Sequence, residues 1–303
     1  STLLNQLAGE VRSIVSAEAG TTRDTVDTMV KRGGKLYQFV DTAGIRRKGK
    51  TKLIAEKLSV IMARKSLERA DVALLVVDAE QGVTGGDATI ASYAKDSGCS
   101  VIIVMNKWDL ALEAARSAAE AEDARGSAHR IEKREKPEKP GKPGRGKYKD
   151  ESASAKALRT LRDPGMLMTE YERLVREKLK FLDFAPVVFL AANTGDRIGK
   201  LYPLIDKVAE SRARRVSTGE INRWLAKVDL ERGTSPVSRK IKIFYMTQAS
   251  TSPPTFVLFT NQDKRLHFSY ERFLENRLRE GFDFTGSPIR FLQKVREFKK
   301  RNR

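Results

Sequence analysis

The stretch VIIVMNKWD, residues 101–109, decides the fold of this chain. Its first five residues, Val101 to Met105, form an apolar run of strand length, typical of a strand buried on both faces. Three polar residues, Asn106, Lys107 and Asp109, follow the run directly. The stretch therefore predicts a buried strand that ends in a polar loop.

The chemistry of this loop indicates recognition of guanine. An Asp109 carboxylate at the strand end can accept hydrogen bonds from the ring N–H and from the exocyclic amine of guanine, whereas adenine offers neither. Such discrimination works because the wrong base leaves buried polar groups unpaired. The stem of Lys107 can lie across the base, and Asn106 can tie neighbouring loops together. The alternative is a polar loop that merely ends a strand.

A second motif, Asp41-Thr42-Ala43-Gly44, follows a strand-like run that ends at Val40. A carboxylate at Asp41 can hold magnesium through water, and Gly44 lets a backbone N–H approach a γ-phosphate. The pattern alone is common, but its place at a strand end upstream of residues 106–109 strengthens the interpretation.

Two further loops extend the pattern. In the sequence GTTRD, residues 20–24, a hydroxyl of Thr21 or Thr22 can coordinate magnesium while a γ-phosphate is bound, and the alternative is a simple Gly-Thr turn. The run PVVFLAANTG, residues 186–195, ends a strand where a backbone N–H at Ala191 or Ala192 can contact the guanine carbonyl.

The order of elements predicts a mostly parallel sheet covered by helices, followed by a smaller α+β region. From about Ala111 to Asp163 the chain is Ala/Glu-rich and then Lys/Pro/Gly-rich, and we expect a disordered basic insertion there. Strands are expected at 25–31, 35–40, 72–77 (fully buried), 101–105, 187–190, 240–247, 255–260 and 288–292, and helices at 87–97, 169–179, 200–209, 220–230 and 270–279. Apolar residues at helical spacing also predict a helix around Ile54 to Met62. Gly33-Gly34 predicts a tight turn between the first two strands, Gly98 a left-handed cap, and Thr218 or Ser217 an N-cap.

The charge balance points to a polyanionic partner. Lys and Arg number 58 against 39 Asp and Glu, which gives a formal net charge of +19. Such an excess favours nucleic acid over a membrane, although basic linkers that merely keep the chain soluble are the alternative. Cys99 is the one cysteine, so no internal disulfide forms, and we expect it to be a small core residue.

Taken in order, these motifs resemble those of a P-loop GTPase, and their residues are similar to those of the Der (EngA) family of bacterial GTPases. The match continues through 214–218, 253–259 and 266–270. The resemblance implies an incomplete second GTPase domain at 1–211, with the insertion at about 111–163, and a KH-like domain with a basic tail at 216–303. Its fold would be α/β, a mostly parallel sheet with helices on both faces, followed by a small α+β domain.

Several residues depart from the family pattern. Ser1 and Thr2 match the end of a P-loop, so its glycines, its lysine and the strand before them would lie upstream, and we expect the loss of that central strand to split the sheet core. Ala191-Ala192 replaces the usual Ser-Ala pair, and Ile45 stands where many GTPases place a glutamine. The α+β region lacks a Gly-x-x-Gly loop.

The resemblance implies a magnesium-dependent GTPase that binds GTP and GDP, hydrolyses GTP slowly with help from potassium, and acts in assembly of the large ribosomal subunit. Ser1 would coordinate magnesium, and Thr21 or Thr22 would close over the γ-phosphate. Asp41 and Gly44 would sense that phosphate. The nucleotide would be bound by Ser1, Thr2, Asp41, Thr42, Ala43, Gly44, Ile45, Asn106, Lys107, Asp109, Ala191 and Ala192.

The expected partners are the large ribosomal subunit and its RNA, for a cytoplasmic monomer without membrane contact. Because the phosphate cradle is incomplete, we expect catalysis by this chain alone to be impaired. Two alternatives remain open. The chain as given acts as a non-catalytic RNA- or ribosome-binding module, or it belongs to an RNA-modification GTPase, since residues 20–24 are shared with such enzymes.

Overall fold

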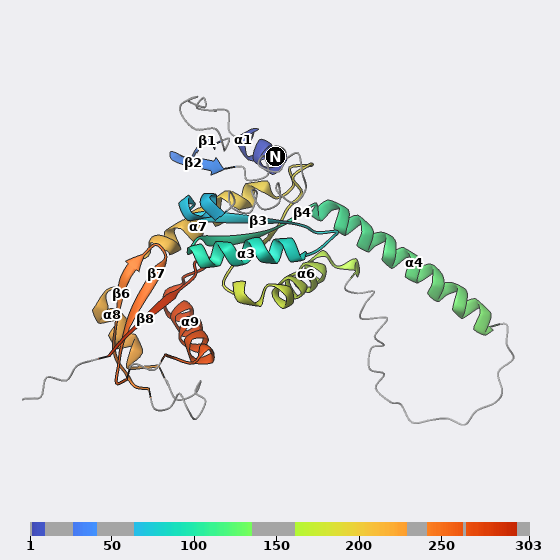
Figure 1. The fold of residues 1–303 in the computed structure, drawn as a ribbon. Helices are drawn as coiled ribbons and strands as arrows, with labels where there is room; N and C mark the ends of the chain where they lie inside the picture. The colour runs from blue at the N-terminus through green and yellow to red at the C-terminus, as the bar shows by residue number, and fades with distance from the viewer. Residues whose placement is uncertain are drawn as a thin grey trace, which may run out of the picture.

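The computed structural model of the chain describes residues 2–9, 27–40, 64–134, 161–228, 241–262 and 265–295 (Figure 1). The first elements along the chain build an α/β unit, and those after α7 (Leu201–Ala213) build a smaller α+β unit. The helix expected around Ile54 to Met62, most of the basic insertion and the basic tail lie outside the described residues.

A three-stranded parallel sheet forms the centre of the α/β unit. It consists of β3 (Val72–Asp78), β4 (Ser100–Asn106) and β5 (Val187–Phe189), with β4 in the middle. The residues of β4 from Val101 to Met105 have no exposed surface, as the apolar run predicted. The middle strand is therefore the centre of the core, and its apolar run ends at the polar residue Asn106.

Helices cover both faces of this sheet, as expected for the fold class. Val101, Ile103 and Met105 point into one core cluster, and Ile102 and Val104 point into the other. The first cluster receives side chains from α3 (Gly85–Ser97), α4 (Trp108–Arg134) and α6 (Pro164–Lys178), and the second from α1 (Thr2–Gly9) and α7. Short 3₁₀ turns, η2 (Lys180–Leu182) and η3 (Ile198–Lys200), flank β5.

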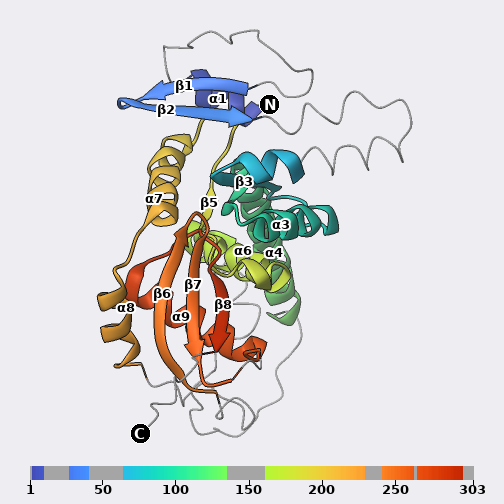
Figure 2. The ribbon, with the colours of Figure 1, turned by 60° about the vertical axis from the view of Figure 1, so that its left-hand side comes forward.

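The sheet core of the α/β unit is in two pieces, as the sequence predicted. Strands β1 (Asp27–Arg32) and β2 (Lys35–Val40) form an antiparallel hairpin that is a sheet of its own, which Figure 2 shows apart from β3. Gly33 and Gly34 make its turn with φ of 56° and 80°, conformations that glycine adopts without strain. The hairpin is tied to α7, since the Tyr37 hydroxyl donates to Asp206 Oδ1 at 2.8 Å.

The prediction that the strand at 72–77 is fully buried is wrong. Within the described residues β3 pairs with β4 alone, so its other edge and part of its side-chain surface stay open. Val76 is 43% exposed, although residues 72–77 of β3 are all apolar. A strand with one neighbour cannot hide side chains that a strand with two neighbours would cover.

Helix α3 begins and ends with the signals that its sequence carries. Thr84 and Asp87 form a reciprocal capping box at the first turn. Gly98 ends the helix in the left-handed region at φ 79°, as predicted for a glycine cap. The next residue, Cys99, is buried, and burial raises the pKa of its thiol to about 12, so it is a core residue as expected.

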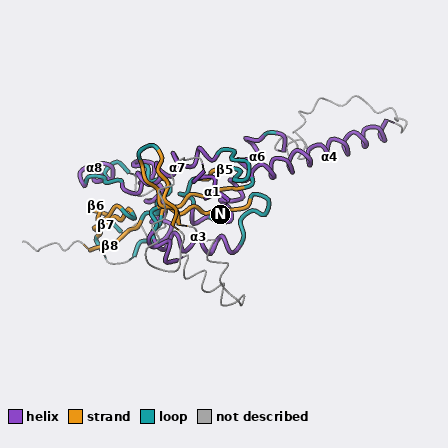
Figure 3. Tube along the Cα trace, turned by 90° about the horizontal axis from the view of Figure 1, so that it is seen from above, coloured by secondary structure: helices purple, strands orange, loops and turns teal. Residues whose placement is uncertain are grey.

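The prediction of a disordered insertion at 111–163 is wrong for its first part, which is helical. Helix α4 runs 27 residues, from Trp108 to Arg134, and projects from the body of the molecule in both Figure 1 and Figure 3. Its Ala, Glu and Arg residues are strong helix formers, and Ala111 and Ala115 are buried against the core, so the start of the helix is anchored. Neither α4 nor another helix in the described part of the chain is long and apolar enough to cross a membrane.

The α+β unit consists of a three-stranded sheet with helices α8 (Thr218–Leu225) and α9 (Phe268–Phe282). The strands are β6 (Ile243–Thr251), β7 (Pro254–Thr260) and β8 (Arg290–Val295), in that order, antiparallel and then parallel. Ser217, one of the two predicted caps, closes α8 in a capping box with Glu220. Asn222 of α8 bonds both backbone groups of Met246 and thereby covers the edge of β6.

The two units meet at the start of β4. The N–H of Val101 donates to the carbonyl of Gly286 at 2.7 Å, and the hydroxyls of Ser100 and Ser287, both fully buried, lie 2.8 Å apart. Ser211 of α7 adds a bond from its hydroxyl to the carbonyl of Asp283 at 2.7 Å. The middle strand therefore carries the joint between the units at one end and the polar loop at the other.

Candidate functional site

The candidate site lies where the three parallel strands of the α/β unit end. In the register of the sheet, Asp78 at the end of β3 pairs with Asn106, and Met105 pairs with Phe189 at the end of β5. Because the strands are parallel, the loops that follow them meet at one edge. The predicted residues Asn106, Lys107, Asp109, Ala191 and Ala192 are brought together there.

Asn106 ties these loops together, as its sequence position suggested. Its side-chain Oδ1 accepts a hydrogen bond of 2.9 Å from the N–H of Ala192. Its backbone carbonyl accepts another of 2.9 Å from the N–H of Ala79, which follows β3. One residue thereby fixes the loops after all three strands relative to one another.

Lys107 is held in place by its backbone and by its charge. Its φ of 61° lies in the left-handed region, which costs a residue with a side chain about 1 kcal/mol or more. The ammonium lies 2.6 Å from Asp78 Oδ2 and 3.9 Å from Glu80 Oε2. The Lys107 ammonium lowers the pKa of the Asp78 carboxyl through this hydrogen bond, and Asp78 in turn raises the pKa of Lys107.

Trp108 anchors the loop in the core. Its side chain has no exposed surface, and its ring centroid lies 4.6 Å from that of Phe189 and 5.1 Å from that of Tyr171. The backbone N–H of Trp108 donates to the carbonyl of Leu190 at 3.1 Å, while the indole Nε1 has no hydrogen-bond partner. The sequence motif assigned no role to Trp108, although an aromatic residue directly after a buried strand is a signal for an anchor.

The loop after β5 turns sharply beside Asn106. The N–H of Ala191 donates to the carbonyl of Asp196 at 3.1 Å, so both alanine N–H groups of the predicted guanine contact are used within the protein. Arg197, in the same loop, has a φ of 61°, like Lys107. Two residues held in the left-handed region at one sheet edge are a feature of functional sites.

The predicted phosphate side of the site falls mostly outside the described residues. Thr2 is described and lies exposed at the start of α1, whose Leu7 is buried in the core. Among the residues with a described placement, no group of three or more His, Cys, Asp or Glu side chains is arranged to hold a metal. The outside positions are Ser1, Thr21, Thr22, Asp41, Thr42, Ala43, Gly44 and Ile45.

Comparison with known proteins identifies both units. Residues 1–107 match a family described as a 50S ribosome-binding GTPase. Residues 215–294 match the KH-domain-like C-terminal domain of EngA bacterial GTPase enzymes. The α/β unit is therefore a P-loop GTPase domain, and the α+β unit is a KH-like domain.

The combination of these two domains belongs to one family. A GTPase Der of Ruminiclostridium cellulolyticum is 41% identical over 98% of the chain, and one of a Geobacillus species is 40% identical over the same share. The chain belongs to the Der (EngA) family, and it spans about half of these relatives, 56% and 57% of their lengths. A structure of an Era variant from Aquifex aeolicus aligns with 97% of the chain and 88% of its own, at 19% identity and a TM-score of 0.37.

Proposed function

We propose that this chain supplies the guanine-binding edge of a magnesium-dependent GTPase that acts on the large ribosomal subunit. The observation that carries the proposal is the loop after β4, in which Asn106 is bonded to Ala192 and Lys107 is held by Asp78. These contacts are made within the protein, so they would hold the loop in one arrangement for a base.

Each residue of the loop has a distinct role in the proposal. Asp109, in the first turn of α4 and partly exposed, accepts two hydrogen bonds from guanine. The stem of Lys107 lies across the base while its ammonium stays at Asp78. Because the Ala192 N–H already donates to Asn106, its contact with the guanine carbonyl requires that this N–H be shared between the two acceptors.

The phosphate and magnesium roles remain proposals that rest on the family resemblance. Ser1 would ligand magnesium, with Thr21 or Thr22 closing over the γ-phosphate and Asp41 and Gly44 sensing it. GTP would favour one arrangement of the domains and GDP another, so that affinity for the ribosome follows the nucleotide. The match to a 50S ribosome-binding GTPase family supports the large subunit as partner. We also propose that the protein is a cytoplasmic monomer that uses potassium.

A second candidate function treats the 303-residue chain by itself as a non-catalytic RNA- or ribosome-binding module. The separation of the β1–β2 hairpin from the β3–β4–β5 sheet favours it, because a GTPase site draws on loops from both pieces. The net charge of +19 supports an RNA partner in either case.

A titration tests the two candidates. The chain and a version extended upstream through a complete P-loop are each titrated with a fluorescent GTP analogue in the presence of magnesium. We expect binding by the extended version and none, or far weaker binding, by the chain alone. Binding by both would show that the P-loop matters less than proposed, and binding by neither would overturn the GTPase proposal.

A further inference from the structure

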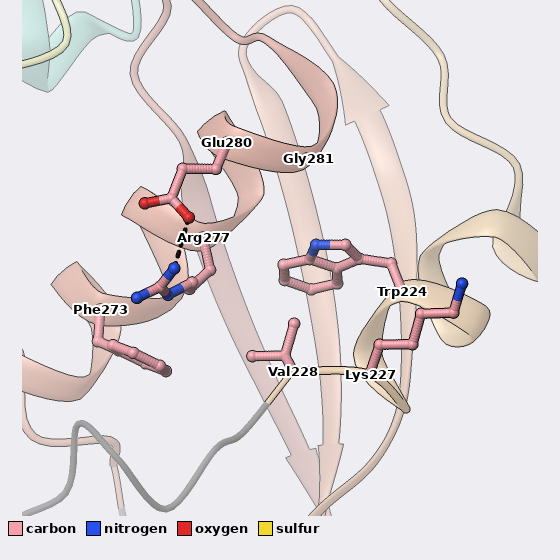
Figure 4. A pocket seen from close by; sticks show the side chains of 7 residues that line it. All are labelled: Trp224, Lys227, Val228, Phe273, Arg277, Glu280 and Gly281. Atoms are coloured by element: carbon pink, nitrogen blue, oxygen red, sulfur yellow. Dashed lines mark hydrogen bonds and ion pairs between the residues drawn. The ribbon is translucent and has the colours of Figure 1, made fainter.

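A second concave site lies in the KH-like domain, between α8 and α9. It is a pocket of about 380 Å³, within the range of roughly 300–1,000 Å³ that small-ligand sites occupy. Figure 4 shows Trp224 and Val228 on one side and residues of α9 on the other. The lining residues are Trp224, Lys227, Val228, Phe273, Arg277, Glu280 and Gly281.

A glycine on α9 sets the position of Trp224. A Cβ at Gly281 would lie 2.7 Å from the indole Nε1 and 3.0 Å from Cδ1, so only glycine lets the ring approach the helix this closely. The Trp224 ring also contacts Phe282 at a centroid distance of 5.7 Å. The indole is therefore braced on its α9 side while it remains partly exposed.

Positive charge borders the same pocket. Lys227 and Arg277 are both exposed, and the guanidinium of Arg277 lies 5.4 Å from the centroid of the Phe273 ring. Glu280 holds that guanidinium through a contact of 2.6 Å. A guanidinium has five N–H donors, so this contact orients Arg277 and leaves donors for a second acceptor.

Two aromatic rings and two cations around one hollow suit a ligand that is both flat and anionic. We propose that the pocket receives one nucleotide of a single-stranded RNA, with its base against Trp224 and its phosphate at Arg277 and Lys227. Base stacking on exposed aromatic side chains beside basic residues is how single strands are generally held. The proposal deepens the proposed function and rests on its RNA partner.

The open face of the sheet is the competing surface. Tyr245 and Leu292 are 41% and 52% exposed there, and the Tyr245 ring packs edge-on against Phe259 at 5.6 Å. This surface offers aromatic contact and one cation, Lys294 opposite Phe259, but its other exposed neighbour, Leu292, is aliphatic. The pocket combines rings with two cations, which the chemistry of a nucleotide requires.

The experiment measures binding of a fluorescein-labelled oligoadenylate of about ten nucleotides, a length within the 4–16 that single-strand sites span. Fluorescence anisotropy is recorded on the 303-residue chain at several salt concentrations. Trp224→Ala should weaken binding roughly 5- to 100-fold, as expected for loss of one stacked base. Gly281→Ala should weaken it in the same direction, because it displaces the indole without removing a ring or a charge.

Charge and fluorescence give independent readouts. Arg277→Gln should lower affinity and reduce the slope of log affinity against log salt by about 1. RNA should quench tryptophan fluorescence, and Trp224→Phe should abolish the quenching, because the other tryptophan, Trp108, is fully buried. Matched controls are Tyr245→Ala on the sheet and Arg223→Gln, an exposed basic residue of α8 outside the pocket.

The outcomes separate the pocket from the function on which it rests. Reduced binding by the Trp224, Gly281 and Arg277 variants with unchanged controls supports the pocket. If Tyr245→Ala or Arg223→Gln weakens binding while Trp224→Ala and Gly281→Ala do not, the pocket proposal is overturned and the RNA partner stands. If the unaltered chain fails to bind the oligoadenylate at low salt, both the pocket proposal and the proposed RNA partner are overturned.

Discussion

At the scale of single residues, the candidate site depends on a few side chains that bond to the backbone or to one another across strand ends. Asn106 contacts the loops after β3 and β5, and Lys107 reaches back to Asp78. These contacts are made within the protein and do not involve a ligand. Asp109 differs from them, since the proposal gives it a direct bond to the base.

Asp109 is therefore the residue that tests base selection. Replacing it in the complete protein by Asn exchanges an acceptor for a donor at one carboxylate oxygen, which opposes guanine and suits xanthine. We expect Asp109→Asn to weaken GTP by a factor of about 100 or more and to favour xanthosine triphosphate. Competition titrations with both nucleotides measure the ratio, and an unchanged preference would remove Asp109 from the guanine site.

The pair formed by Asp78 and Lys107 predicts a pH dependence. Because the pKa of Asp78 is lowered in the folded state, its contribution to stability is present above the unfolded pKa of a carboxyl and is lost as the pH falls through the lowered value. The raised pKa of Lys107 makes its contribution present below the unfolded pKa of lysine and lost as the pH rises through the raised value.

We therefore expect the pair to stabilise the chain across the neutral range and to fade at both acidic and strongly alkaline pH. A double-mutant cycle of Asp78→Asn and Lys107→Met, followed by urea unfolding at several pH values, measures the coupling. Because Lys107 is 40% exposed, salt should weaken the coupling. A coupling that stayed constant down to the most acidic pH would contradict the assignment.

At the scale of elements, the loop after β4 is supported by Trp108. Trp108→Ala removes a fully buried ring that contacts Phe189 and Tyr171, and should destabilise the chain by about 3–5 kcal/mol. Trp108→Phe should cost clearly less, because an aromatic ring remains and the indole Nε1 has no hydrogen bond to lose. Urea unfolding followed by circular dichroism compares the two, and equal losses would show that ring packing is not what anchors the loop.

The elements also show what the sequence could predict. The run Val101–Met105, the cap at Gly98 and the hairpin turn at Gly33-Gly34 were predicted because each follows from local chemistry. The exposure of β3 was not, since an apolar strand has the same sequence whether it has one neighbour or two. Helix α4 was missed because its Ala/Glu composition was read as part of a low-complexity insertion, although its first turns are anchored in the core.

The candidate site was predicted in part. Its motif residues were found because guanine chemistry restricts residue type and order, and five of them lie together at the strand ends. The partners Asp78 and Asp196 were not predicted, because their contacts arise from strand register and loop shape. For the same reason the sequence could not show that Ala191 and Ala192 have their N–H groups already engaged.

At the scale of the whole molecule, β4 connects two functions. Its end carries the proposed guanine loop, and its start is bonded to the KH-like domain through Val101 and Ser100. The turn at Gly286 bonds the GTPase domain with both of its backbone groups, since its N–H also donates to the carbonyl of Phe184 at 2.9 Å. The joint therefore depends on close approach of backbone to backbone.

Gly286 tests whether this joint couples the two domains. Its φ is 74°, and a Cβ there would lie 2.7 Å from Val208 Cγ2 and 3.3 Å from the carbonyl oxygen of Val101. Gly286→Ala should cost roughly 1–3 kcal/mol from overpacking, with about 1 kcal/mol more for the left-handed backbone. The strain falls on the interface, so hydrogen exchange should quicken at Val101 and Gly286 more than in the core of either domain.

Gly199→Ala is the matched control, because a Cβ at that position meets nothing within 4 Å. Calorimetry should show one transition for the control and a lower or divided transition for Gly286→Ala. Equal profiles for the two variants would mean that the domains are joined by the linker after α7 rather than by β4.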